Sequence, residues 1–328
     1  MSSKPNVKIS GSALRRPKLL RRLDIQTIEH LALQLGSSQD ELLKFAASPR
    51  AFRTGFFFDK KGKQRPKAEP LGRLKPILKR LNAILQRLDL PLAMHGGRAG
   101  CSNLTNAQPH RIKDVVLTFD IKGFFPSISH QDVFDIFHHR CGCKPEIARL
   151  LASLTTHNDQ LAQGSPPSTI IAALVAEPLI KRIETLVRLH GGEVTLYVDD
   201  IAVSGPSRLR EFKQRIIDII TQEGFESHAD KVHVRSRDEE QIVTGVKVND
   251  QLDVSGDRIG LLRGQVRKLE KLIESNELLS PQEVGDLVGK LGYLSRLNRG
   301  AAKHYRKRIG RMEEYLQRTQ NLARSPAT

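Results

Sequence analysis

Leu196-Tyr197-Val198-Asp199-Asp200-Ile201-Ala202-Val203 is the stretch that decides the fold. It places two adjacent aspartates inside an apolar run whose Val, Ile and Tyr residues favour strands, whereas Asp is common in the turns between strands. A β-hairpin with two acids at its turn is therefore predicted. Ordinary hairpins prefer Asn-Gly or Asp-Gly at the turn, and neither pair is present here. Because carboxylates at a strand end suit Mg²⁺, we favour a metal site over a plain turn.

A further carboxylate comes from the upstream stretch Val115-Val116-Leu117-Thr118-Phe119-Asp120. This β-branched run ends at Asp120 and is followed by Gly, aromatic residues and Pro, so the predicted strand carries a carboxylate at its own end. Taken alone, Asp120 suits a strand end or a helix cap. Two-metal phosphoryl-transfer sites hold ions roughly 4 Å apart and need carboxylates from more than one segment. Asp120 is therefore the candidate partner of Asp199 and Asp200.

Three motifs carry a family resemblance: F-D-I-K-G-F-F-P-S-I at 119–128, Gln163-Gly164-Ser165-Pro166-Pro167-Ser168, and Tyr197-Val198-Asp199-Asp200. In order and spacing they resemble the palm motifs of reverse transcriptases. Two signatures narrow the resemblance to bacterial retron reverse transcriptases, within the group II intron-like superfamily. They are Asn106-Ala107-Gln108-Pro109-His110, before the first catalytic strand, and Val243-Thr244-Gly245, after the Asp-Asp hairpin.

The resemblance implies an α+β right-hand polymerase with fingers, a palm built on a small antiparallel sheet, and a helical thumb. The expected parts are a helical N-terminal region at 1–50, fingers at 51–115, a palm at 116–250 with interleaved fingers helices around 132–160, and a thumb at 251–328. Apolar residues at helical spacing predict a helix over 132–154. A strand is predicted over 224–234. The helical, basic pattern after Asp257 predicts a thumb of about three helices, one of them starting at Ser280-Pro281-Gln282-Glu283.

The resemblance also assigns roles around the predicted metal site. Asp120, Asp199 and Asp200 would be the catalytic residues and, with Ile121, would hold two Mg²⁺ ions, for which Mn²⁺ could substitute. Phe125, five residues after Asp120, stands where reverse transcriptases place an aromatic gate against a ribose 2′-hydroxyl. Ordinary core packing of one of two adjacent Phe residues is the alternative for this position.

Nucleotide-binding roles are expected in three other places. The basic turn after Phe56-Phe57-Phe58 is either a solvated charge run or, by resemblance, the fingers hairpin that grips the triphosphate through Arg65 and a lysine, Lys61 or Lys60. A triphosphate leaving group needs cations as charge develops. Gln163 and Gly164 would support the nascent base pair, with Gly164 allowing close backbone approach. Lys231 is either a surface lysine or a general acid near the pyrophosphate.

The two signatures are expected to lie near the RNA or the primer. Asn106 and His110 can hydrogen-bond bases or the 2′-hydroxyl, and an architectural role is an equal alternative. Val243, Thr244 and Gly245 would form the primer-grip hairpin between palm and thumb.

Composition agrees with a nucleic-acid enzyme. The 328 residues are 39% hydrophobic and carry a formal net charge of +17, which favours a polyanionic partner because Lys and Arg release counterions from phosphates. No apolar run reaches the roughly 18 residues of a membrane span, and Met1-Ser2-Ser3-Lys4 does not resemble a signal peptide, so a cytoplasmic protein without a membrane partner is expected. Three cysteines, Cys101, Cys141 and Cys143, support neither a disulfide framework nor a zinc site.

The expected function is that of an RNA-directed DNA polymerase using dNTPs. By resemblance it would prime from a 2′-hydroxyl of its cognate structured non-coding RNA and keep the branched RNA–cDNA product, msDNA. A separate effector protein, host RNase H and an antiphage defence role are further implications. Two alternatives are open: another bacterial reverse transcriptase of the group II intron type, disfavoured by the signatures and by the absence of maturase and endonuclease regions, and a catalytically inactive basic RNA-binding scaffold, disfavoured by the intact aspartates.

Overall fold

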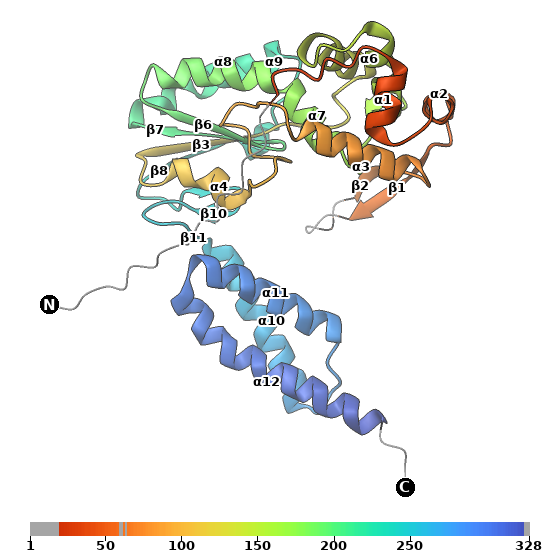
Figure 1. Cartoon of the computed structure of the whole chain (residues 1–328). Coiled ribbons are helices and arrows are strands. Elements are labelled where there is room, and N and C mark those ends of the chain that lie inside the picture. Colours follow the sequence, from red (N-terminus) through yellow and green to blue (C-terminus); the bar gives the residue numbers. More distant parts are fainter. Residues whose placement is uncertain (1–19, 59–61, 63, 325–328) are drawn as a thin grey trace, which may run out of the picture. The chain divides into compact units, whose positions relative to one another are not determined.

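The computed structural model describes residues 20–58, 62 and 64–324, and the chain divides into two units (Figure 1). The first unit comprises residues up to 99 together with 123–178, and the second comprises 100–122 and 179 onward. Residues 100–115 thus belong to the unit that holds the strands expected of the palm, although the resemblance places these residues in the fingers. The functional subdomains inferred from the sequence remain a prediction, because compactness alone does not assign function.

The first unit is mainly helical. Its elements are α1 (Ile28–Leu35), α2 (Gln39–Ala47), β1 (Phe52–Phe58), β2 (Gln64–Pro70), α3 (Leu74–Leu85), α5 (His130–Asp135), α6 (Pro145–Thr155), β4 (Thr156–His157), β5 (Gln160–Leu161) and α7 (Ser168–Val175). Strands β1 and β2 pair antiparallel, with Phe58 opposite Gln64, which confirms the hairpin predicted from the phenylalanine run. The apolar face of α3 is fully buried, as its helical periodicity predicts.

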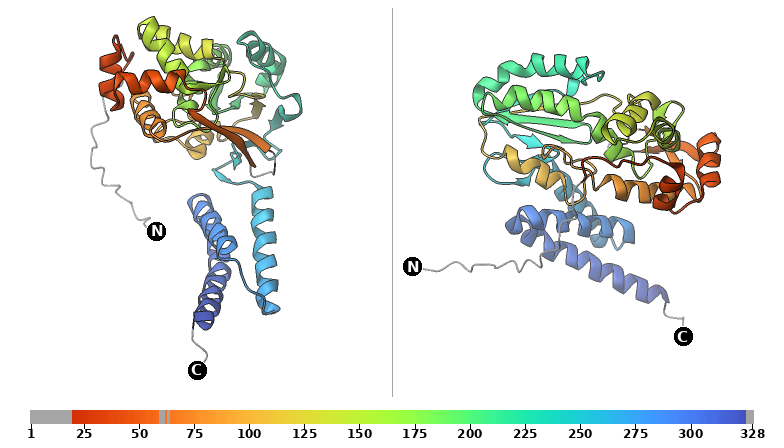
Figure 2. Two further views of the ribbon diagram at one scale, coloured as in Figure 1. Left: turned by 90° about the vertical axis from the view of Figure 1, so that its right-hand side faces the viewer. Right: turned by 45° about the horizontal axis from the view of Figure 1, so that its top comes forward.

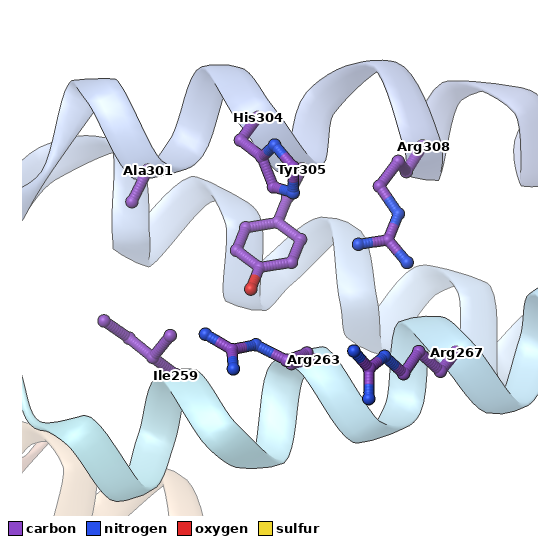
Figure 3. Close-up of a pocket in the computed structure, with 7 residues that line it drawn as sticks. All are labelled: Ile259, Arg263, Arg267, Ala301, His304, Tyr305 and Arg308. Atoms are coloured by element: carbon purple, nitrogen blue, oxygen red, sulfur yellow. The ribbon is translucent and has the colours of Figure 1, made fainter.

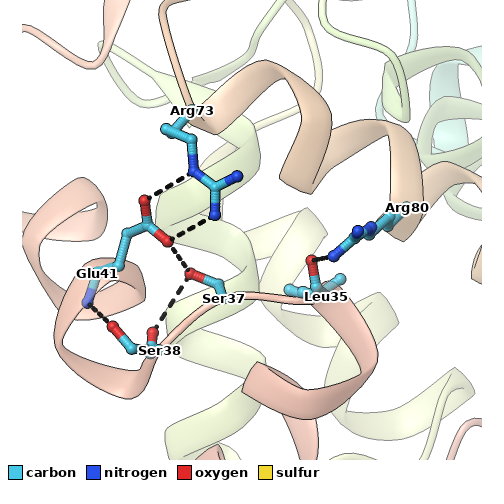
Figure 4. A network of polar contacts seen from close by, with 6 residues as sticks. All are labelled: Leu35, Ser37, Ser38, Glu41, Arg73 and Arg80. Atoms are coloured by element: carbon cyan, nitrogen blue, oxygen red, sulfur yellow. Dashed lines mark hydrogen bonds and ion pairs between the residues drawn. The ribbon is translucent and has the colours of Figure 1, made fainter.

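A polar network joins the starts of α2 and α3 (Figure 4). The Ser38 hydroxyl caps α2 by accepting from the Glu41 amide at 3.1 Å, while the Glu41 carboxylate accepts from Ser37 Oγ at 2.6 Å and from Arg73 Nε at 3.3 Å. The hydrogen bonds from Ser37 and Arg73 lower the pKa of Glu41, and the bond from Ser37 has the larger effect. Arg80 donates to the Leu35 carbonyl at 2.9 Å and so satisfies the last turn of α1.

The predicted helix over 132–154 is wrong in one respect, because it is interrupted. Helix α5 continues into a π-helical turn, Ile136–Arg140, and the chain then leaves the helix until α6 begins at Pro145. Gly142 has φ +74°, a left-handed conformation that ends a helix, and Pro145 favours a new first turn. The apolar spacing on either side predicted the helices but not the break.

The second unit is built on a four-stranded antiparallel sheet in the order β6-β7-β3-β8. Its strands are β3 (Val115–Asp120), β6 (Glu193–Tyr197), β7 (Asp200–Gly205) and β8 (His233–Ser236). Helices α8 (Glu177–Arg188) and α9 (Lys213–Gln222) run along one side of this sheet in Figure 1. Strand β3 lies in the centre and is buried at Val115, Val116, Leu117 and Phe119, as its β-branched run predicts. The small antiparallel sheet and the α+β class are thus confirmed.

The expected strand over 224–234 starts later than predicted. Ala229–Lys231 forms a 3₁₀ turn, and β8 covers only His233–Ser236. The main chain of His228 donates to the Asp120 carbonyl at 2.8 Å, which holds this segment against the end of β3 without continuing the ladder.

The remaining elements of this unit are α4 (Asn103–Ala107), β9 (Ile242–Val243), β10 (Val246–Lys247), β11 (Asp253–Val254), α10 (Gly256–Glu274), α11 (Pro281–Leu297) and α12 (Arg299–Arg324). The last three are the helices expected of a thumb, and Pro281 begins α11 as predicted. Figures 1 and 2 show the course of these three helices. They share one apolar core, which includes Val266, Leu287 and Ile309. No helix in the described part of the chain is long and apolar enough to span a bilayer.

An ion pair between α10 and α12 makes the stability of these helices pH-dependent. Arg308 Nε donates to Glu270 Oε1 at 2.7 Å, and this contact lowers the pKa of Glu270 below its ordinary 4.5. A carboxylate whose folded pKa is depressed stabilises the fold above its unfolded pKa and loses that contribution as the pH falls through the folded value. We expect Glu270→Gln to lower the urea midpoint at pH 7, with the difference from wild type shrinking below pH 4.5. Glu283→Gln, at an exposed pair with Lys268, is the matched control, and an equal loss in both variants would contradict the prediction.

Candidate active site

Strand pairing brings the three predicted aspartates to one edge of the four-stranded sheet. In the antiparallel pair of β3 and β7, Asp120 lies directly opposite Asp200. The Ile121 amide donates to the Asp199 carbonyl at 2.9 Å, which extends the contact one residue beyond the strands. Directly opposed residues have Cβ atoms roughly 5 Å apart. Segments almost 80 residues apart in sequence (120 and 199–200) therefore present their acids at the same place.

The turn that carries Asp199 is strained. Tyr197 pairs with Asp200, so Val198 and Asp199 form a two-residue hairpin turn. Val198 has φ +61°, whereas Asp199 does not have a positive φ, and a positive φ at the first central residue is the pattern of a type II′ turn, which normally has Gly there. A β-branched residue in this region is an outlier, and such strain concentrates at functional sites. The turn was predicted from the sequence, but its strain was not.

Relieving this strain has a measurable consequence. We expect Val198→Gly to raise the free energy of unfolding by about 1 kcal/mol. The left-handed conformation costs an L-residue about 1–2 kcal/mol, and the larger conformational entropy that glycine loses on folding offsets part of this gain. Activity should fall, because the turn then holds Asp199 less rigidly. Urea denaturation measures the first effect. Val194→Gly, in extended and buried backbone on β6, should instead destabilise. Destabilisation by both variants would contradict the strain argument.

Lys231 adds a cation to this edge of the sheet. Its Nζ lies 2.6 Å from Asp120 Oδ1, and the two side chains are 40% and 17% exposed. The pair offsets part of the negative charge that the three aspartates concentrate there. Of the two alternatives for Lys231, a bare surface lysine is disfavoured, because the ammonium contacts one of the predicted catalytic residues.

The chemistry of these donors fits a hard divalent cation. Carboxylate oxygens from Asp120, Asp199 and Asp200, with a main-chain carbonyl at Ile121, are the ligand types that Mg²⁺ and Mn²⁺ accept. Within residues 20–58, 62 and 64–324, however, no three His, Cys, Asp or Glu side chains are grouped tightly enough to form a complete metal site. The structure therefore supports the position of the donors at one sheet edge and leaves metal binding as a proposal.

The other nucleotide-binding candidates lie in the first unit, apart from Lys61 and Lys60, which fall outside the described residues. Arg65 is half-buried on β2, opposite Phe57. Gln163 accepts from the Ala68 amide at 2.7 Å through its carbonyl, which attaches the Gln163-Gly164 turn to the β1–β2 hairpin. Gly164 has φ +107°, and a Cβ there would lie 3.1 Å from Lys67 Cγ, so the glycine allows this turn to pack closely against the Lys67 side chain of the hairpin.

Phe125 and its neighbour Phe124 differ in burial. Phe124 is 3% exposed and belongs to the core, whereas Phe125 is half-buried, with ring centroids 5.8 Å apart. Core packing is thus carried by Phe124. Phe125 retains exposed ring surface, which a gate against a ribose needs, and its role stays a prediction.

His110 is an internal residue. It is fully buried, and its two ring nitrogens lie 2.7 Å from Ser204 Oγ on β7 and 2.8 Å from Thr195 Oγ1 on β6. Asn106 is also fully buried and donates to Thr244 Oγ1 at 3.4 Å. Side chains in these positions cannot reach an RNA base without rearrangement, so the architectural alternative is favoured for both.

The Val243-Thr244-Gly245 signature forms the turn of the short hairpin β9–β10. Val243 pairs with Val246, and the intervening Thr244 and Gly245 have φ +46° and +75°, the pattern of a type I′ turn. A Cβ on Gly245 would overlap the Arg258 guanidinium, which itself lies over the Tyr293 ring. Asn103 Nδ2 donates to the Tyr293 hydroxyl at 2.8 Å. The two signatures therefore form one packed module, in which α4 supports the hairpin.

Several residues of this module were not predicted from the sequence. Thr195 and Ser204 hold His110, and the fully buried Gln241 donates from Nε2 to the Lys113 carbonyl at 3.1 Å and to the Arg235 carbonyl at 3.2 Å. The available signal was a hydroxyl residue at an inward position of each of two apolar strands, where a buried polar group needs a partner.

The sequence comparisons agree with this geometry. A family model described as reverse transcriptase (RNA-dependent DNA polymerase) matches residues 59–249, more than half of the chain, including all three aspartates. The chain belongs to the reverse transcriptase family. The retron resemblance is also confirmed, because curated retron reverse transcriptases align with most of the chain.

Three of these relatives illustrate the extent of the match. The retron Mx65 and Mx162 reverse transcriptases of Myxococcus xanthus are 30% and 28% identical, over 73% and 82% of this chain. The retron Ec86 reverse transcriptase of Escherichia coli is 27% identical over 65% of this chain. The aligned regions span 60%, 62% and 65% of those proteins. A solved foamy viral protease–reverse transcriptase in complex with double-stranded DNA is 14% identical, with a TM-score of 0.40, and covers 85% of this chain and 42% of that one.

Proposed function

We propose that this reverse transcriptase family member is an RNA-directed DNA polymerase whose reaction centre lies at the Asp120, Asp199 and Asp200 edge of the sheet. The observation that carries the proposal is the register of β3 against β7, which sets Asp120 opposite Asp200 and next to Asp199. Phosphoryl transfer needs charge stabilisation and positioning more than covalent chemistry, so a rigid carboxylate cluster with a nearby cation is what the reaction requires.

In this proposal the three aspartates and the Ile121 carbonyl hold two Mg²⁺ ions. Bound ions would stabilise the charge on the attacking and leaving oxygens. Lys231, which pairs with Asp120, would donate a proton to the leaving pyrophosphate or stabilise its negative charge. Arg65 would bind the triphosphate, Gln163 and Gly164 would support the base pair, and Phe125 would exclude a ribose 2′-hydroxyl.

Metal removal tests the polymerase proposal. The purified chain should extend an oligo(dT) primer on poly(rA) with dTTP and Mg²⁺, lose the activity in excess EDTA, and regain it when Mg²⁺ or Mn²⁺ is restored. UTP in place of dTTP should be incorporated at least tenfold more slowly, which tests the gate at the same time. Extension that persists in EDTA, or its absence with both metals, would contradict the proposal.

We further infer that the template is a cognate structured non-coding RNA, primed from one of its own 2′-hydroxyls to give msDNA. Two observations support this: the relatives are named as retron reverse transcriptases, and both retron signatures pack together as one module. A separate effector, host RNase H and a role in antiphage defence belong to the same proposal.

This finer proposal is tested by expressing the chain with its flanking genomic DNA and analysing the nucleic acid that co-purifies. A discrete DNA whose mobility changes after RNase treatment supports the retron assignment. Active enzyme without such DNA would favour another bacterial reverse transcriptase. Bound RNA without DNA, from a protein inactive on poly(rA), would favour the basic scaffold.

A further inference from the structure

A concave pocket of about 360 Å³ lies between α10 and α12, within the three-helix thumb (Figure 3). It is lined by Ile259, Arg263, Arg267, Ala301, His304, Tyr305 and Arg308. The figure shows the side chains of both helices directed toward the space between them. Ligand pockets start at about 300 Å³, so this volume suits one small organic group.

The pocket holds an excess of positive charge. Arg263 and Arg267 are four residues apart on α10, a spacing at which like charges repel each other and destabilise a helix. Neither lies within ion-pair distance of a carboxylate in the part of the chain that the structure describes, although Arg267 interacts electrostatically with Glu270. Arg308, facing them from α12, is bound by the Glu270 carboxylate and so has a fixed orientation. Three guanidinium groups with one carboxylate leave two positive charges without a counter-charge, which favours an anionic ligand.

The floor of the pocket has a different chemistry. Tyr305 is only 4% exposed, and its hydroxyl points into the pocket in Figure 3. This hydroxyl has no hydrogen-bond partner among the described residues and is accessible from the pocket, so it is available to a ligand. Ile259 and Ala301 provide apolar surface beside it. A simple anion would use the arginines alone and leave the tyrosine and the apolar wall unused.

We propose that this pocket binds a single unpaired nucleotide of RNA, with the phosphate on Arg263 and Arg267 and the base against Tyr305 and Ile259. The inference rests on the proposed function, since it assumes an RNA-binding polymerase. Duplex RNA presents a convex row of phosphates and keeps its bases stacked inside, so it contacts the arginines but does not fill the pocket. An extruded nucleotide satisfies both the charge and the apolar floor.

Binding of two matched RNA hairpins tests the proposal. They share one stem, and one of them contains a single-nucleotide bulge, prepared with each of the four bases. We expect the wild-type chain to bind at least one bulged hairpin about tenfold or more tightly than the paired hairpin, by fluorescence anisotropy at fixed salt. In the Arg263→Gln/Arg267→Gln variant, the affinity for the bulged hairpin should fall to the affinity for the paired hairpin. Each charged hydrogen bond that is lost should weaken binding roughly tenfold.

Two further variants separate the pocket from general electrostatics. Arg306→Gln removes an exposed cation of α12 outside the pocket and should weaken both hairpins by the same factor. Tyr305→Phe removes only the hydroxyl and should reduce the preference for the bulge several-fold at unchanged affinity for the paired stem. Equal wild-type affinity for all hairpins would overturn the proposal, as would a preference that survives in the double variant. Wild-type extension on poly(rA) is measured on the same protein, so failure of the polymerase proposal is distinguished from failure of the pocket.

Discussion

Replacing Asp199 and Asp200 together by asparagine is expected to reduce primer extension on RNA by at least about 10³-fold. Asparagine keeps the size of each side chain but removes the charge that would hold divalent cations, and lost metal stabilisation is worth several kcal/mol, or roughly a factor of ten for each 1.4 kcal/mol. Single-turnover extension of labelled oligo(dT) on poly(rA) measures the effect. The thermal unfolding midpoint should not decrease, because the variant relieves repulsion between neighbouring carboxylates.

Glu193→Gln is the matched control for this experiment. Glu193 is an exposed acid on the same hairpin, at the far end of β6, and the change removes a charge without approaching the turn. Its activity should stay within about twofold of wild type. An Asp199→Asn/Asp200→Asn variant as active as Glu193→Gln would place the reaction centre elsewhere.

Replacing His110 by alanine is expected to lower the free energy of unfolding by about 2–4 kcal/mol, because it creates a cavity and leaves the buried hydroxyls of Thr195 and Ser204 without their shared partner. Urea denaturation at neutral pH measures the loss. His139→Ala is the control, since this histidine is exposed and contacts Asp135 and His138, and it should change stability by less than about 0.5 kcal/mol.

The same variant decides between the two roles considered for His110. If the residue contacts RNA directly, His110→Ala should weaken RNA binding and leave the unfolding transition close to that of wild type. If the residue is architectural, His110→Ala should lower the free energy of unfolding. The affinity for RNA, measured at a temperature well below the unfolding midpoint, should then change little. The burial of both ring nitrogens against strand hydroxyls favours the second result.

The elements that the sequence predicted correctly are those whose signal is local. The apolar phenylalanine run predicted β1, a β-branched run predicted β3, helical periodicity predicted α3, and Pro281 marked the start of α11. The antiparallel sheet followed from the resemblance of three spaced motifs to a known family. The interruption at Gly142 was missed, because apolar spacing continues on both sides of a turn that tertiary contacts stabilise.

The candidate site was predictable in its residues and not in its contacts. Three acids at strand ends pointed to Asp120, Asp199 and Asp200, but their register depends on pairing between distant strands, which no local pattern encodes. The strain at Val198 was hidden for a related reason, since valine propensity favours extended backbone and the turn overrides it. The packing of Asn106 against Thr244 joins two motifs that were interpreted separately from the sequence, the first as an RNA contact or an architectural element and the second as a primer grip.

The most direct test of the account is to map where a divalent cation binds. Fe²⁺ in place of Mg²⁺, with ascorbate and peroxide, generates hydroxyl radicals that cleave the backbone near the bound ion, and the fragments are identified by mass spectrometry. If the three aspartates hold the ion, we expect two clusters of cuts, at 119–122 and 197–201, that excess Mg²⁺ suppresses and Asp199→Asn/Asp200→Asn abolishes. Cuts confined to other segments, or a pattern unchanged in that variant, would contradict it.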